Sequence, residues 1–330
     1  MRVLYSNLVL AVMVVALPSA SAAQKYRVTD LGTLGGKVSS ARAINVAGQV
    51  AGYAEKVSSN NHAFLWSELD GIRDLGTLDG VESLAFGIND SGHVVGASGT
   101  SAFIWTKNSG MQDLGSLGGT GTLAHAINNF GEVVGYSALG NGFEHAFLWT
   151  VTGGMRDLGT LGGDFSAAYA VNEAGQVVGY SDLADNATFH AFLWTQANGM
   201  QDLGTLGCSF SVATAINARG QIIGDTCTSS GANVGFIWNS STGMRSLGNT
   251  GPSIPNAQGI NSSNEVVGFL DFQTGEEGGF LWTPSGKIQN LNALIQFPKV
   301  LVTAANAINR VGQIAGNGDN QHAILLTPID

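Results

Sequence analysis

The chain has 330 residues, of which 44% are hydrophobic and 12% charged, and its 47 glycines are about twice the usual share. Its 14 basic and 24 acidic residues give a net charge of −10 without any basic cluster, which argues against nucleic acid and anionic membrane surfaces as partners. A composition rich in glycine and poor in charge predicts many short strands joined by tight turns.

The first 23 residues predict a secretory signal peptide. Arg2 supplies a positive start, residues 8–17 are apolar, and residues 20–22 or 21–23 offer a cleavage site of small side chains. The alternative is an uncleaved membrane anchor, but this run is too short to span a bilayer. No later segment is long and apolar enough to do so. We therefore expect a secreted or extracellular protein, or alternatively a periplasmic one, whose mature part starts at residue 24.

Three marks recur seven times each along the remaining chain. Asp-Leu-Gly-Thr-Leu or a relative begins at Asp30, Asp74, Asp113, Asp157, Asp202, Ser246 and Asn290. Ala-Ile-Asn or a similar triplet ends at Asn45, Asn89, Asn128, Asn172, Asn217, Asn261 and Asn309. His-Ala-Phe-Leu-Trp-Thr or a variant begins at His62, Ser101, His145, His190, Val234, Gly278 and His322. A spacing near 44 residues, as from Asp30 to Asp74, indicates a repeat architecture.

Each repeat predicts four short antiparallel strands, for which residues 166–172, 176–180, 190–195 and 200–203 serve as the example. Four strands in a unit of this length predict one blade of a β-propeller. The last repeat lacks its fourth strand, and residues 26–31 form a fourth strand with no repeat before it. Pairing 26–31 with 322–327 would close a single all-β domain, 24–330, as a seven-bladed propeller. The alternative is an array of β-repeats that does not close.

The combined motif of residues 145–163, His-Ala-Phe-Leu-Trp-Thr followed by Gly-Met-Arg-Asp-Leu-Gly-Thr-Leu-Gly-Gly, resembles the HAF-repeat family of extracellular repeat proteins. The resemblance covers nearly the whole mature chain, and it is looser in the last three repeats. It implies an extracellular bacterial protein and brings no settled activity, cofactor or catalytic residue with it.

Two periodic positions are expected to be structural. The tryptophan position is a candidate sugar platform, but its periodicity favours packing between blades; it holds Trp66, Trp105, Trp149, Trp194, Trp238 and Trp282, with Leu326 seventh. The histidine of the third mark and the aspartate 12 residues later vary together, so we interpret them as hydrogen-bonded pairs rather than metal or catalytic groups. These pairs are His62–Asp74, His145–Asp157 and His190–Asp202, with His322–Asp30 formed between the chain ends.

Cys208 and Cys227 belong to the same repeat, in loops predicted to share a face, so a disulfide between them is expected in an oxidising compartment. The alternative is two thiols. Every change in repeat length falls on that same face, which makes it the candidate binding surface. Its longest loops, 137–144, 181–189 and 269–277, hold the candidate ligand residues Phe143, Glu144, Asp182, Asp185, Phe189, Asp271 and Phe272.

Aromatic rings beside carboxylates suit sugars, so we expect a monomeric, non-catalytic module that binds an extracellular or surface polysaccharide, or a surface protein. The alternative for the aromatic rings is packing on neighbouring loops. The alternative function is a propeller hydrolase or lyase that acts on carbohydrate through loop carboxylates, including Glu144, Asp182 and Asp225. The sequence predicts no cofactor and no metal site.

Overall fold

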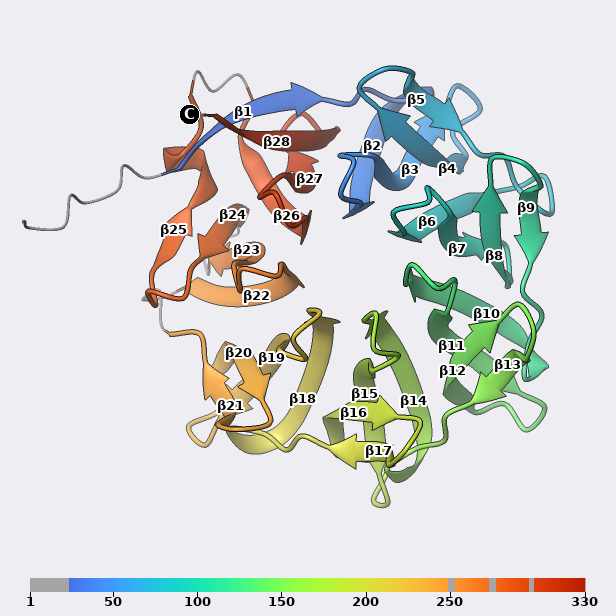
Figure 1. Cartoon of the computed structure of the whole chain (residues 1–330), viewed down its shortest axis with the longest axis vertical. Coiled ribbons are helices and arrows are strands. Elements are labelled where there is room, and N and C mark those ends of the chain that lie inside the picture. Colours follow the sequence, from blue (N-terminus) through green and yellow to red (C-terminus); the bar gives the residue numbers. More distant parts are fainter. Residues whose placement is uncertain (1–23, 249–252, 273–276, 297–299, 330) are drawn as a thin grey trace, which may run out of the picture.

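The structure is a computed structural model that describes residues 24–248, 253–272, 277–296 and 300–329. The predicted signal peptide lies outside the described residues. Within them the regular structure is β-strand, apart from the short 3-10 helix η1 (Leu291–Ala293). Figure 1 shows the strands gathered into sheets that stand side by side around a common centre.

Strands are grouped here by their position in each sheet, from the centre outwards. The first strands are β2 (Gly35–Ile44), β6 (Ser83–Ile88), β10 (Gly118–Ile127), β14 (Gly162–Val171), β18 (Gly207–Ile216), β22 (Ser253–Ile260) and β26 (Val302–Ile308). The second strands are β3 (Val50–Lys56), β7 (Val94–Ser98), β11 (Val133–Leu139), β15 (Val177–Leu183), β19 (Ile222–Thr228), β23 (Val266–Phe272) and β27 (Ile314–Gly318). The third strands are β4 (Asn61–Ser67), β8 (Ser101–Thr106), β12 (Glu144–Thr150), β16 (Phe189–Thr195), β20 (Asn233–Asn239), β24 (Glu277–Trp282) and β28 (Ala323–Ile329). The fourth strands are β5 (Gly71–Asp74), β9 (Gly110–Asp113), β13 (Gly154–Asp157), β17 (Gly199–Asp202), β21 (Gly243–Ser246), β25 (Ile288–Asn290) and β1 (Lys25–Asp30).

Each sheet is antiparallel and pairs its four strands in this order. The sheets β14–β17 and β18–β21 are additionally joined by one parallel bridge between Phe189 and Phe210. The example strands of the sequence prediction are present but differ in length. The first begins four residues early, at Gly162, whose positive φ of 115° lets it pair with Leu183.

β1 completes the sheet made by β26, β27 and β28, so the two ends of the described chain lie side by side (Figure 1). Its residues pair with β28 from Lys25 opposite Ile329 to Asp30 opposite Ile324. The Tyr26 backbone also bonds the other way, donating to the Leu294 carbonyl at 3.0 Å. β1 is therefore held from both sides.

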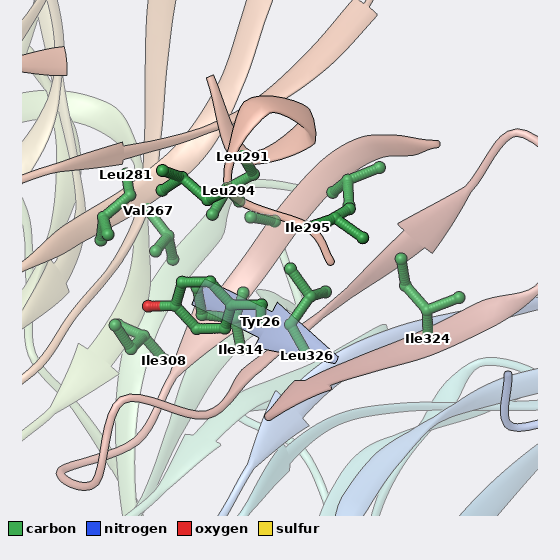
Figure 2. Close-up of a cluster of buried hydrophobic side chains, with 12 residues drawn as sticks. Tyr26, Val267, Leu281, Leu291, Leu294, Ile295, Ile308, Ile314, Ile324 and Leu326 are labelled. Carbon is green, nitrogen blue, oxygen red and sulfur yellow. The ribbon is translucent and has the colours of Figure 1, made fainter. Parts of the chain in front are cut away.

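Tyr26 is the side chain that anchors β1. Figure 2 shows its ring surrounded by aliphatic side chains, among them Val267, Ile308 and Leu326. It is only 2% exposed, and burial, with a smaller contribution from Glu265, raises the pKa of its hydroxyl to about 12. β1 is thus built into the core of the last sheets.

The core lies between neighbouring sheets, as the periodic Trp position predicts. The phenylalanine of each third strand is fully buried: Phe64, Phe103, Phe147, Phe192, Phe236 and Phe280, with Ile324 in β28. The tryptophan two residues later contributes to the same clusters; Trp66, for example, packs with Leu31 and Leu325 of the adjoining sheet. Burying these faces requires the neighbours, because no single sheet covers its own side chains.

The asparagine that ends the second sequence mark forms a belt of hydrogen bonds around the centre. Each Asn side-chain amide donates to the main-chain carbonyl of the next one, at 3.0–3.4 Å. The series runs through Asn45, Asn89, Asn128, Asn172, Asn217, Asn261 and Asn309, and Asn309 returns to the Asn45 carbonyl. The sequence identified these residues only as the end of a recurring mark, whereas the structure shows that they join the sheets.

A glycine in each second strand allows the first strand to approach closely. A Cβ placed on Gly179 would lie 1.9 Å from the Ala167 carbonyl oxygen, far inside van der Waals contact. The same approach, at 1.9–2.2 Å, holds for Gly52, Gly96, Gly135, Gly224, Gly268 and Gly316. The repeated glycine is thus a packing requirement of an extended strand and has nothing to do with a turn.

Candidate functional site

The predicted binding loops are shorter than the sequence suggested. The loop placed at 181–189 comprises residues 184–188, since Asp182 and Phe189 pair with each other in β15 and β16. Likewise Glu144 pairs with Ala138 and begins β12. The hairpins extend this far because Gly142 and Asn186, with φ of 89° and 51°, close tight turns. The predicted residues Asp271 and Phe272 end β23, and their side chains lie outside the described part of the structure.

The acids of this face form a group around the β15–β16 turn. Burial raises the pKa of Asp182, and the nearby Asp164 and Asp185 raise it further. Asp185 is stabilised in its ionised form, because the Thr188 hydroxyl and the main-chain amides of Ala187 and Thr188 donate to it and lower its pKa to about 2. Asn186 ties the turn to Asp164 through a 2.8 Å bond from its side-chain amide. The face is therefore strongly acidic.

The predicted aromatic residues are half-buried and contact further rings. Phe143 packs edge-on against Phe165 with ring centroids 5.7 Å apart, and Phe165 remains 39% exposed. Phe189 lies between Tyr180 at 5.6 Å and Phe210 at 5.7 Å. The alternative interpretation, in which these rings pack on their neighbours, thus holds for the buried part of each ring.

These rings belong to a continuous aromatic row that the sequence prediction missed. Successive centroid distances of 4.6–5.9 Å connect Phe86, His125, Tyr169, Tyr180, Phe189 and Phe210. Tyr136 joins the row beside His125 at 5.8 Å. The available sequence signal was the tyrosine after Val-Val-Gly in the third and fourth repeats. The row runs from the centre of the molecule to the acidic turn.

The histidine and aspartate of each predicted pair lie within hydrogen-bond distance. The His Nδ1 to Asp carboxylate distances are 2.8–3.0 Å for His62–Asp74, His145–Asp157, His190–Asp202 and His322–Asp30. In the second repeat the Ser101 hydroxyl takes the histidine's place and donates to Asp113 at 3.1 Å.

The same aspartates close the turn that leaves the fourth strand. In the first pair, Asp74 also accepts from the Gly76 amide at 2.8 Å. Burial raises the Asp74 pKa, but bonds from Lys56, Gly76 and His62 outweigh it and hold the pKa below its ordinary value. The Asp74 carboxylate therefore has a structural role in this turn. In the described residues, no three His, Cys, Asp or Glu side chains gather closely enough to hold a metal ion.

Cys208 and Cys227 form a disulfide, as the sequence predicted. The bond joins the start of β18 to the end of β19, with 5.6 Å between the two Cα atoms. It fixes the sheet that adjoins the Phe189–Phe210 bridge, so it supports the candidate face from one side.

Asp225 was grouped with the loop acids, and the structure corrects this. It lies within β19 and its Oδ1 accepts the Ala257 amide of the neighbouring sheet at 3.1 Å. Burial raises its pKa to about 7, only partly offset by that bond. Asn317 occupies the same position in β27 and accepts the Ala41 amide in the same way. Asp225 is thus a bridge between sheets.

Comparison with solved structures identifies the architecture. TolB from Acinetobacter baumannii matches with a TM-score of 0.51 at 13% identity, over 86% of this chain and 64% of its own length. The extracellular domain of BT4673 from B. thetaiotaomicron matches with 0.58 at 9% identity, over 93% of this chain and 40% of its own. YCF48 bound to D1 peptide matches with 0.50 at 10% identity, over 93% and 97%. These neighbours are β-propellers.

The chain has a β-propeller fold. At such low identity the likeness extends to the fold alone, and this chain spans less than two thirds of the length of the first two neighbours. The sequence matches no protein-family model and no curated protein. Across the described ranges, no helix is long and apolar enough to cross a membrane.

Proposed function

We propose that the chain is an exported, seven-bladed propeller of the HAF-repeat type, closed by β1, that acts as a monomeric, non-catalytic binding module for an extracellular polysaccharide. The observation that carries the binding role is the row of aromatic rings that reaches the acidic turn at Asp182 and Asp185. Rings stack on the apolar faces of sugars while carboxylates accept bonds from their hydroxyl groups.

The charge of the face indicates which polysaccharide it would accept. Glu144, Asp164, Asp182 and Asp185 would repel a polyanion, so a neutral polysaccharide fits best. The disulfide supports export, because such bonds persist in oxidising compartments. The pairing of β1 with β28 and the closed asparagine belt support the ring.

Retention of the mature chain on neutral polysaccharides tests the proposal. Affinity electrophoresis of residues 24–330 through gels containing soluble glucans, mannans or galactans should show retardation by at least one of them. The double variant Asp182→Asn, Phe189→Ala should lose retardation. A matched control on the opposite face, Glu68→Gln with Phe130→Ala, removes an exposed acid and a ring that is 76% exposed, and should keep it.

If the control variant lost retardation and the Asp182/Phe189 variant kept it, the polysaccharide would bind the opposite face, and the assignment of the binding face would be wrong. Absence of retardation in every gel would contradict polysaccharide binding, and a surface protein would then remain as the proposed partner. Release of reducing ends during incubation would instead support the carbohydrate hydrolase or lyase.

A further inference from the structure

Each first strand contains a β-bulge at the same place. Pairing with the second strand shifts by one residue there, as between Ala168 and Ala170, so that Tyr169 has no partner. The shift recurs in all the first strands, three residues before the belt asparagine. A bulge redirects its side chain, and here it directs seven of them to the centre of the ring.

The bulge residue differs from one repeat to the next, between neighbours that stay small. An alanine precedes it in every repeat and an alanine or glycine follows it, yet no two repeats share the bulge residue itself. In ring order the seven are Arg42, Phe86, His125, Tyr169, Thr214, Gln258 and Asn306. All seven line one central cavity of about 530 Å³. Such a volume suits a small molecule.

The cavity is bounded on one side by isoleucines. Ile88, Ile127, Ile260 and Ile308 line both this cavity and the one at the asparagine end of the centre, so they lie between the two. On the other side the aromatic row connects Tyr169 with Tyr180 and Phe189. The cavity therefore has an apolar floor and adjoins the candidate face.

Its wall divides into an aromatic arc and a polar arc. Phe86, His125 and Tyr169 are consecutive in the ring and in contact, at 5.7 and 4.6 Å between centroids. His125 is neutral near pH 7, because burial and, to a lesser extent, Arg42 lower its pKa to about 4. Its buried Nε2 has no hydrogen-bond partner among the described residues.

The polar arc contains donors that the fold does not use. Thr214 and Asn306 each donate to a carbonyl of the adjoining sheet at 2.7 Å, but the Gln258 side chain has no partner within the described chain. Among the described residues, the polar contacts of Arg42 are with the Tyr53 hydroxyl, at 3.2 Å, and with the Tyr53 ring, and none of the residues that line the cavity carries a carboxylate. The cavity thus presents one cation without a counter-charge in an otherwise acidic protein.

We propose that this cavity binds a monosaccharide bearing one carboxylate. The aromatic arc covers an apolar face of the sugar ring, Gln258 bonds to its hydroxyl groups, and Arg42 pairs with the carboxylate. The aromatic arc is the central end of the row invoked for polysaccharide binding, whereas Arg42 and Gln258 lie outside that row. A variant at Arg42 therefore tests this inference separately from the polysaccharide.

Calorimetric titration with D-glucuronate, D-glucuronamide and D-glucose tests this inference on the mature chain. Glucuronamide matches glucuronate in shape but lacks the charge. We expect glucuronate to bind about tenfold more tightly than either neutral sugar. Arg42→Gln should abolish that difference, whereas Arg219→Gln, an exposed arginine on the asparagine side, should preserve it.

Equal binding of the three sugars, no binding of glucuronate at millimolar concentration, or unchanged selectivity in Arg42→Gln would each overturn the inference. The double variant Asp182→Asn, Phe189→Ala provides the second control. It should bind glucuronate as the unmodified chain does even if it no longer binds polysaccharide. Equal melting temperatures establish that Arg42→Gln is folded.

Discussion

The first prediction concerns Asp225, because burial in the folded protein disfavours the ionised form of its carboxyl group. The Asp225→Asn variant keeps an oxygen that can accept the Ala257 amide, as Asn317 does from Ala41 in the equivalent sheet. It removes the group whose ionisation burial disfavours. We expect the variant to be more stable than the unmodified protein at neutral pH.

The magnitude and sign follow from the raised pKa. With a folded pKa near 7 against an ordinary 3.8, the unfolded chain loses the Asp225 proton first as the pH rises. The loss of stability caused by ionising Asp225 is absent below pH 3.8, grows up to about pH 7 and is constant above that pH. Between pH 5 and pH 8 it should lower the free energy of unfolding by roughly 2 to 3 kcal/mol.

Urea denaturation followed by fluorescence at pH 5, 6, 7 and 8 measures this difference. The free energy of unfolding of Asp225→Asn relative to the unmodified chain should rise by that amount across the series. A difference that does not change with pH would show that Asp225 is already ionised in the folded protein, and the burial argument would be wrong.

Two further stability predictions concern the anchoring of β1 and the disulfide. Tyr26→Ala should lower the free energy of unfolding by about 3 to 5 kcal/mol in the same assay, because it removes a fully enclosed ring. Lys25→Ala, at the exposed neighbouring residue, should change this free energy little. Equal losses of stability in the two variants would show that Tyr26 does not anchor β1. Replacing Cys208 and Cys227 together by serine should lower the free energy of unfolding by about 3 kcal/mol, given their separation of 19 residues. Thiol titration of the unreduced, unmodified protein should find no reactive thiol. Two titrated thiols would contradict the disulfide.

The repeat made the all-β fold predictable because its three marks recur together in every four-stranded unit. The Trp position could be assigned to the core from its period alone, since packing between units favours the same side chain in every repeat. Hairpin length was not predictable. Gly142 and Asn186 occur in segments rich in polar residues, and only their positive φ values show that the strands continue to meet there.

The site was predicted only in part for a related reason. The sequence identified Phe189 and Asp182 because their loop varies in length, and this criterion misses positions that vary within a strand of constant length. Tyr169 sits in a bulge, which shifts the alternation of side chains and leaves no local sequence signature beyond flanking alanines. Asp225 was misjudged because burial by a neighbouring sheet cannot be inferred from the chain around it.

The asparagine belt separates two tasks that a repeat must perform. The bulge residue lies within the first strand and faces the centre, whereas the asparagine three residues later, just past the end of that strand, holds the neighbouring unit. A substitution at the bulge therefore leaves the asparagine belt intact, and among the described residues only at Thr214 and Asn306 does it also remove a bond to the adjoining sheet. Duplicated units of this kind can diversify their central residues one at a time, each under separate selection, while the scaffold that presents them stays the same.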